Sequence, residues 1–314
     1  MEISLKDRYE GSLAGLACGD AVGTTVEFSP RGSFAPVRDM TGGGPFGLDA
    51  GQWTDDTSMA LCLAESLVEK QGFDARDQMA RYLNWWRWGY LSSTGVCFDI
   101  GRTTRLALSR FELDGDPWAG SPSPDAAGNG SIMRLAPVVL YFHPQLDVVL
   151  RYAAESSRTT HAAPEALDCC RLLAFVLSRA LSGCPKQALW EGSSAHVTER
   201  RVREISEGGF TAKKGDAIRG SGYCVESLEA ALWCVHSTAS FEDAVLAAAN
   251  LGDDADTTAA IAGQIAGAVH GIGAIPAEWK RKLYMAGEIT ALADRIFTAA
   301  ITSRAGGDCR PREA

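Results

Sequence analysis

The sequence lacks the features that mark membrane, secreted and zinc-thiolate proteins. No apolar run free of charge is long enough to span a bilayer. The first residues, MEISLKDRYE, contain no apolar segment of the kind that a signal peptide requires. The nine cysteines show no paired CxxC spacing, and an odd number without a framework is typical of reduced thiols. These absences predict a cytoplasmic protein that has no membrane partner.

Strand signals are equally scarce. Alternating runs rich in β-branched residues are missing, whereas helical spacing of apolar residues recurs along the chain. No repeat of 20–50 residues is visible. A chain of 314 residues with 46% hydrophobic composition can bury a large core. We therefore predict an all-α fold, with a single compact many-helix domain over residues 1–304 and a frayed tail over 305–314.

Positive charge is in deficit. The chain has 30 lysines and arginines against 39 aspartates and glutamates, which gives a formal net charge of -9. An acidic surface disfavours binding to nucleic-acid backbones and to anionic membranes. A nucleic acid is therefore not an expected partner, and a monomer is the default expectation for the oligomeric state.

Acidic residues are concentrated at two points where a helix should begin, WTDDT at 53–57 and GDDADTT at 252–258. One such cluster is explained as a helix cap that suits the helix dipole. Two clusters of packed carboxylates repel unless something neutralises them. If the two helix starts meet, their oxygens form a site for a hard cation such as Mg²⁺, Mn²⁺ or Ca²⁺. Neither cluster contains cysteine or histidine, which disfavours zinc.

Glycine recurs every four residues in two predicted helices. The first, over 8–22, carries one such stripe, and the helix after the second acidic cluster carries another: Gly11, Gly15, Gly19 and Gly23, and Gly263, Gly267 and Gly271. Glycine inside a helix costs about 1 kcal/mol relative to alanine. We therefore expect another backbone to approach each stripe closely, so that the two helices pack against each other or around a common centre. Close packing for stability alone is the open alternative.

Two loops also carry candidate residues. Glu27 begins a loop rich in glycine and proline that precedes the first acidic cluster, and such a loop can act as a lid. A solvated loop glutamate is an equal alternative. The run GNGS at 128–131 precedes an apolar segment and could form an anion-binding backbone nest, although a plain turn is the commoner explanation.

The runs GDDADTTAAIAG and WTDDT resemble the two signature motifs of the ADP-ribosylglycohydrolase family, which includes dinitrogenase-reductase-activating glycohydrolase and the ADP-ribosylarginine hydrolases. Weaker similarities follow in the family's order, so that the resemblance covers nearly the whole chain, from about residue 8 to 279. They are GSLAGLACGDAVG, the Glu27 region, residues 95–104, GNGSIMR, SRTTH and GSGYCVESLEAALW. The resemblance implies the same all-helical fold that the pattern predicts.

The resemblance also implies roles for particular residues. It implies a site for two Mg²⁺ ions, with Mn²⁺ as the alternative, and its ligands are Thr54, Asp55, Asp56, Asp254, Asp256 and Thr257. Asp253 is a neighbour and not a ligand. Glu27 matches the family's mobile glutamate, and Asp99 matches an acid near the scissile bond. By the same resemblance, the residues expected to bind ADP-ribose are Asn129, Gly130 and Ser131 in a loop on the phosphate side, and His161, Gly222 and Tyr223 in the pocket.

The implied activity is hydrolysis of the bond between ADP-ribose and a modified protein side chain, with arginine as the commoner acceptor in the family. Asp55, Asp56 or Asp99 would take a proton from the attacking water, and Glu27 or Asp99 would protonate the leaving group. The expected partners are an ADP-ribosylated protein as substrate and ADP-ribose as product. A cognate ADP-ribosyltransferase or a toxin target would supply the modified protein.

Three alternatives stay open at this level. The chain could hydrolyse another ADP-ribose linkage, whether O-linked, on a nucleic-acid end or in a small molecule. It could bind ADP-ribose without cleaving it, although that function would require a damaged acidic set. It could also be a structural helical protein in which Ca²⁺ ties the acidic clusters together.

Overall fold

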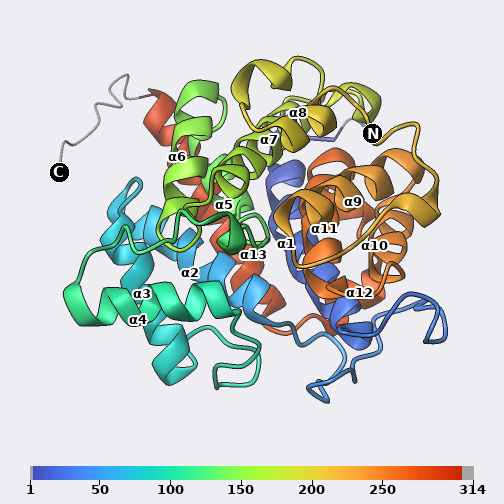
Figure 1. Cartoon of the computed structure of the whole chain (residues 1–314), viewed down its shortest axis with the longest axis horizontal. Coiled ribbons are helices and arrows are strands. Elements are labelled where there is room, and N and C mark those ends of the chain that lie inside the picture. Colours follow the sequence, from blue (N-terminus) through green and yellow to red (C-terminus); the bar gives the residue numbers. More distant parts are fainter. Residues whose placement is uncertain (1–2, 306–314) are drawn as a thin grey trace.

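Helices α1 (Leu5–Gly23) and α11 (Ala255–His270) form the centre of the computed structural model (Figure 1). The structure describes residues 3–305, with the side chains of 303–305 excepted. The two helices lie antiparallel, as contacts between residues early in α1 and residues late in α11 show. For example, the Ser12 hydroxyl donates to the carbonyl of Gln264, 3.1 Å away, across 252 residues of sequence. This arrangement brings the end of α1 to the start of α11.

The glycine stripes make this contact close. A Cβ atom added to Gly15 would lie 2.3 Å from the carbonyl oxygen of Gly263, and one added to Gly263 would lie 2.0 Å from the carbonyl oxygen of Gly15. At Gly19 the added atom would lie 2.1 Å from the carbonyl oxygen of Ala259. Side chains would therefore force the two backbones apart. The predicted tight packing of these two helices on each other is confirmed.

The other helices surround this pair (Figure 1). The longer ones are α2 (Asp55–Lys70), α3 (Ala75–Trp88), α4 (Arg102–Asp114), α6 (Leu146–Arg158), α7 (Pro164–Leu181), α9 (Cys224–Ser237), α10 (Phe241–Ala249) and α13 (Ala286–Ala305). The shorter ones are α5 (Ala136–Phe142), α8 (Arg200–Ser206) and α12 (Ala277–Lys282). The 3₁₀ turns are η1 (Thr24–Val26), η2 (Pro124–Ala126), η3 (Lys186–Ala188), η4 (Ser193–His196), η5 (Gly215–Ala217) and η6 (Ile272–Ala274). Helices α9 and α10 pack on α11, whereas α2, α3 and α4 lie on the other side of the molecule.

No two segments within residues 3–305 pair as a sheet, and the few isolated bridges include Gly128 with Tyr223. The predicted all-α fold is therefore confirmed. In the described part of the chain, no helix has both the length and the apolar composition that crossing a bilayer requires. The predicted tail over 305–314 lies outside the described residues, except for its first residue, which ends α13.

One predicted helix is interrupted. Helical spacing over 279–302 predicts a single helix, but α12 ends at Lys282 and α13 begins at Ala286. Between them, Met285 adopts a positive φ of 53°. The backbone N–H of Tyr284 donates to the carbonyl of Gly51, 2.9 Å away, instead of to a carbonyl within the helix. This contact with a distant loop explains the break, which local sequence cannot reveal.

Candidate active site

The two acidic clusters meet at the starts of α2 and α11. Thr54 and Asp254 occupy the cap positions of these helices, so that Asp56 and Asp256 fall in the first turns. The Thr54 hydroxyl lies 3.2 Å from Asp256 Oδ2, and the Thr257 hydroxyl donates to Asp56 Oδ2 at 3.1 Å. The oxygens that the sequence places 201 and 202 residues apart therefore converge on one point.

Asp20 supports this arrangement from α1, and sequence reasoning missed it. Its carboxylate accepts hydrogen bonds from the backbone N–H groups of Thr54 and Thr57, at 2.9 and 3.0 Å, and from both threonine hydroxyls, at 2.9 and 2.6 Å. Asp20 thus performs the N-cap role for α2, because Thr54 makes no side-chain cap bond of its own. The available signal was a single carboxylate inside the small-residue run ACGDAVG.

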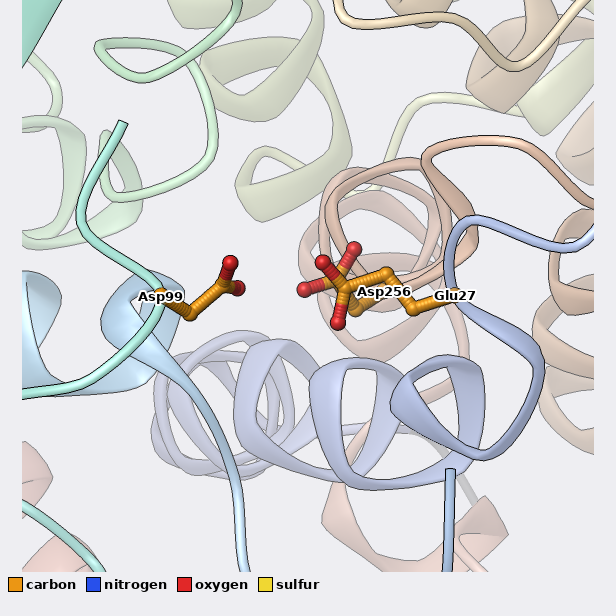
Figure 2. Close-up of side chains that lie close together, drawn as sticks. All are labelled: Glu27, Asp99 and Asp256. Carbon is orange, nitrogen blue, oxygen red and sulfur yellow. The ribbon is translucent and has the colours of Figure 1, made fainter. Parts of the chain in front are cut away.

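Three carboxylates from separate segments face one another in the centre of the site. Glu27, Asp99 and Asp256 each offer an oxygen within 4.8 Å of the others (Figure 2). Burial, reinforced by the charge of Asp99, raises the pKa of Glu27 to about 10. Burial also raises the pKa of Asp99 to about 7. Such crowding persists only if protons or a cation neutralise the charge.

The remaining predicted ligands share this environment. Burial, followed by the charges of neighbouring carboxylates, holds the pKa of Asp55, Asp56 and Asp256 well above the usual range. Asp56 Oδ1 and Asp256 Oδ1 are buried and accept no hydrogen bond from any group within residues 3–305. A buried carboxylate oxygen without a donor is costly. A site made only of oxygens, two of them unsatisfied, fits a hard divalent cation.

Glu27 points into the cluster and is 4% exposed, so the solvated-loop alternative is wrong. The segment that follows it is fastened to the loop before α11. The backbone N–H of Phe28 donates to the carbonyl of Asp253 at 2.7 Å, and the N–H of Asp253 donates to the carbonyl of Ser29 at 2.8 Å. The guanidinium of Arg31 donates to the carbonyls of Gly215, at 2.7 Å, and of Ile218, at 2.6 Å. That this segment moves as a lid stays a prediction.

The predicted ADP-ribose-binding residues adjoin the acids. Asn129 donates through its side-chain amide to Asp254 Oδ2 at 2.9 Å and through its backbone N–H to the carbonyl of Gly222 at 3.1 Å. A Cβ atom on Gly222 would lie 3.2 Å from Asp254 Oδ2, so a side chain there would crowd this carboxylate. Gly222 and Tyr223 line a pocket of about 340 Å³. The Tyr223 hydroxyl donates to Glu165 Oε2 at 2.5 Å, which fixes the ring.

The other members of this set lie deeper. Ser131 is 2% exposed, and its hydroxyl is engaged by the Ser157 hydroxyl at 2.8 Å. His161 is also buried, and burial together with the charge of Arg134 lowers its pKa to about 3. A Cβ atom on Gly130 would lie 2.8 Å from the His161 ring, so only glycine lets the loop approach it this closely.

Arg134 and Thr160 hold the ring of His161 in place. The Arg134 guanidinium donates to the Thr160 hydroxyl at 2.7 Å. That hydroxyl also shares a hydrogen bond with His161 Nδ1, 2.8 Å away. The other ring nitrogen, Nε2, lies nearest to a Cβ position on Gly128 and close to one on Gly130. Sequence reasoning named His161 but neither of the two residues that orient it.

Comparison with known proteins identifies the family. A profile of the ADP-ribosylglycohydrolase family matches residues 1–306. The chain is 45% identical over 293 residues to the ADP-ribosylarginine hydrolase Tri1 of Serratia proteamaculans (strain 568), covering 93% of this chain and 79% of the relative. It is 47% identical over 296 residues to the Tri1 protein of Pseudomonas putida (strain GB-1), covering 94% of this chain and 79% of that relative.

More distant relatives and solved structures agree with this result. The ADP-ribosyl-[dinitrogen reductase] glycohydrolase of Rhodospirillum rubrum is 34% identical over 286 residues, covering 90% of this chain and 92% of the relative. A solved structure described as an ADP-ribosylglycohydrolase-related protein complex superposes with a TM-score of 0.83 at 45% identity, covering 95% of this chain and 99% of that one. The chain belongs to the ADP-ribosylglycohydrolase family.

Proposed function

We propose that the protein is a metal-dependent hydrolase that removes ADP-ribose from modified arginine side chains of other proteins. The convergence of the two acidic helix starts carries this proposal, because the Thr54–Asp256 and Thr257–Asp56 contacts join both signature motifs into one buried site. Two relatives that cover most of the chain are named ADP-ribosylarginine hydrolases. The substrate is then an ADP-ribosylated protein, and the product is ADP-ribose.

The proposed cofactor is a pair of Mg²⁺ ions, with Mn²⁺ as the alternative. The residues that would hold them are Thr54, Asp55, Asp56, Asp254, Asp256 and Thr257. Bound divalent ions would supply positive charge that orients an oxygen ligand and lowers the pKa of water. Within the protein, Asp20 fixes the Thr54 and Thr57 hydroxyls, and Asn129 fixes Asp254, so that the oxygens are oriented before any cation binds.

Glu27 and Asp99 perform the proton transfers in this proposal. The arginine departs as a neutral guanidine when the bond breaks from its guanidinium form, so the proton must stay on the leaving group in the transition state. Glu27 is proposed to supply or retain that proton, because its buried carboxyl group faces the centre of the cluster. Asp99, which faces the same centre from another segment, is proposed to accept a proton from water. Asp55 and Asp56 are the alternative acceptors.

The test is release of ADP-ribose from an ADP-ribosylarginine-modified protein, with and without Mg²⁺. Two isosteric variants form a matched pair, since each removes one negative charge from the same motif. Asp256→Asn removes a buried carboxylate of the site and should abolish release. Asp253→Asn changes an exposed side chain beside it and should retain release, because asparagine tolerates the positive φ of 57° at this position.

Other results would each point to an alternative. If arginine-linked ADP-ribose is not released but free ADP-ribose raises the melting temperature, the linkage is wrong, and O-linked, nucleic-acid and small-molecule derivatives are tested next. If no derivative is cleaved, the protein binds ADP-ribose without catalysis. If Ca²⁺ raises the melting temperature and ADP-ribose does not, the acidic clusters form a structural cation site.

The biological setting is part of the proposal. A transferase that modifies a cellular protein, or a toxin that does so, would create the substrate. The cytoplasmic location and the monomeric state stay predictions from the sequence. Size-exclusion chromatography with light scattering tests the monomer directly.

A further inference from the structure

Three phenylalanine rings contact one another, and two of them are sequence neighbours of Glu27 and Asp99. The ring centroids of Phe28 and Phe46 are 6.2 Å apart with an interplanar angle of 76°, and those of Phe46 and Phe98 are 5.1 Å apart at 59°. Phe28 is 64% exposed, although burial of so large an apolar side chain is normally favourable. Phe46 and Phe98 are half-buried. We call these three rings the aromatic wall.

The aromatic wall connects the same two chain segments that carry the carboxylates of Glu27 and Asp99. Phe28 directly follows Glu27, and Phe98 directly precedes Asp99. Glu27 and Asp99 point toward each other from separate segments (Figure 2). Phe46 contacts both of the other rings, so the wall connects the same two segments one residue away from the acids.

The backbone at this point is held in an uncommon conformation. Phe28 has a φ of 59° and Asp99 a φ of 57°, and both values are costly for residues other than glycine. The paired hydrogen bonds between the Phe28 segment and Asp253 hold the first of them in place. Chain conformation therefore directs Glu27 inward while Phe28 stays at the surface.

The proposed ADP-ribose side of the site uses other groups. Asn129 contacts Asp254, and Gly222 and Tyr223 line the neighbouring pocket. None of the three rings lines that pocket. A bond placed among the carboxylates thus has ADP-ribose toward the pocket, and the aromatic wall is a second surface that reaches the same carboxylates.

We propose that the aromatic wall of Phe28, Phe46 and Phe98 binds the guanidinium group of the ADP-ribosylated arginine and selects arginine-linked substrates. A guanidinium is planar, delocalised and weakly hydrated, and it stacks on aromatic faces. Glu27 and Asp99 add carboxylates that attract a cation. A serine side chain has no positive charge and no planar group, so it would gain no cation–π or stacking interaction from these rings. The proposal rests on the proposed function, since it assigns the acceptor side of the same site.

The test is Phe46→Leu, because Phe46 joins the wall without adjoining either acid in sequence. Losing a cation–π contact should lower kcat/KM on the arginine-linked substrate by about 2- to 30-fold, mainly through a higher KM. Inhibition by agmatine, a small guanidinium compound, should weaken by a similar factor. Affinity for free ADP-ribose should not change. Phe46→Tyr keeps an aromatic face and should retain wild-type kcat/KM.

Phe34→Leu is the matched control, since Phe34 is a half-buried phenylalanine of the same segment that makes no ring contact within residues 3–305. It should leave kcat/KM unchanged. Wild-type kcat/KM in Phe46→Leu, or an equal loss in Phe34→Leu, would overturn the inference while leaving the proposed function intact. Absence of release by the wild-type protein would instead refute the proposed function, and the assigned acceptor with it.

Discussion

Replacing Gly19 with alanine tests whether the close approach of α1 and α11 holds the active site together. The added Cβ would lie 2.1 Å from the carbonyl oxygen of Ala259 and 2.5 Å from its carbonyl carbon. Both are backbone atoms of α11, so no side chain can rotate away. The helices must move apart by about 1 Å, which forfeits a quarter to a half of the dispersion attraction along their contact.

The magnitude follows from two opposing effects. Overpacking typically costs about 1–3 kcal/mol, and a clash between two backbones lies at the upper end. Alanine in a helix recovers about 1 kcal/mol relative to glycine. We therefore expect Gly19→Ala to lower the free energy of unfolding by about 2 kcal/mol. Because Asp20 is the next residue and holds Thr54 and Thr57, divalent-cation affinity should fall as well.

Urea unfolding followed by tryptophan fluorescence measures the first effect. Gly287→Ala in α13 is the matched control, because an added Cβ there meets no atom within 4 Å. This variant should be as stable as the wild type or up to about 1 kcal/mol more stable. A Gly19→Ala protein that matches Gly287→Ala in stability would refute the reasoning, since the glycine stripe would then have no steric purpose.

Four further predictions address the site. In metal-free protein the melting temperature should fall as the pH rises from 5 to 8. Burial raises the pKa of Asp20 to about 6 and the pKa of Asp99 to about 7. In this pH range the folded state therefore keeps protons that the unfolded chain has already released, so a higher pH favours unfolding. At pH 8 Asp256→Asn should raise this melting temperature by about 1.5 °C per kcal/mol of relieved repulsion, and it should abolish activity. Differential scanning fluorimetry measures the first effect, and the release assay measures the second. Asp20→Asn should weaken Mn²⁺ binding by about 10- to 100-fold in calorimetric titration. The NH₂ group of asparagine cannot accept hydrogen bonds from the backbone N–H groups of Thr54 and Thr57, so the start of α2 would be held less firmly. Tyr223→Ala should weaken ADP-ribose binding by about 5- to 150-fold through loss of base stacking, whereas Tyr223→Phe should bind nearly as the wild type does.

Local patterns predicted much of this fold. Aspartate and glycine mark helix ends chemically, and in the structure Asp74 and Gly89 occupy the two cap positions of α3. The glycine stripes predicted which two helices meet, because glycine repeated inside a helix is costly unless another backbone lies against it. The break between α12 and α13 was missed, because its cause is a hydrogen bond to Gly51 far upstream in the chain.

The meeting of the acidic residues was predicted to a similar extent. The two acidic motifs indicated which carboxylates converge, because several carboxylates in one helix turn need neutralisation. Asp20 escaped notice, since a single carboxylate in a helix is ordinary until its four donors are seen in space. The ring contacts of Phe28, Phe46 and Phe98 likewise depend on how three loops converge, and nothing in their spacing indicates it.

The α1–α11 contact also has a consequence for the timing of biosynthesis. Ser12 and Gln264 are 252 residues apart, so at 5–20 residues per second a ribosome adds the second about 13–50 s after the first. Throughout that interval α1 lacks the partner for its glycine face, and the carboxylates of Asp20, Asp55 and Asp56 lack the other half of their site. The centre of the molecule therefore assembles only after α11 has been synthesised, late in translation. We expect chains truncated before α11 to expose the glycine face of α1 and to be recognised by chaperones and proteases.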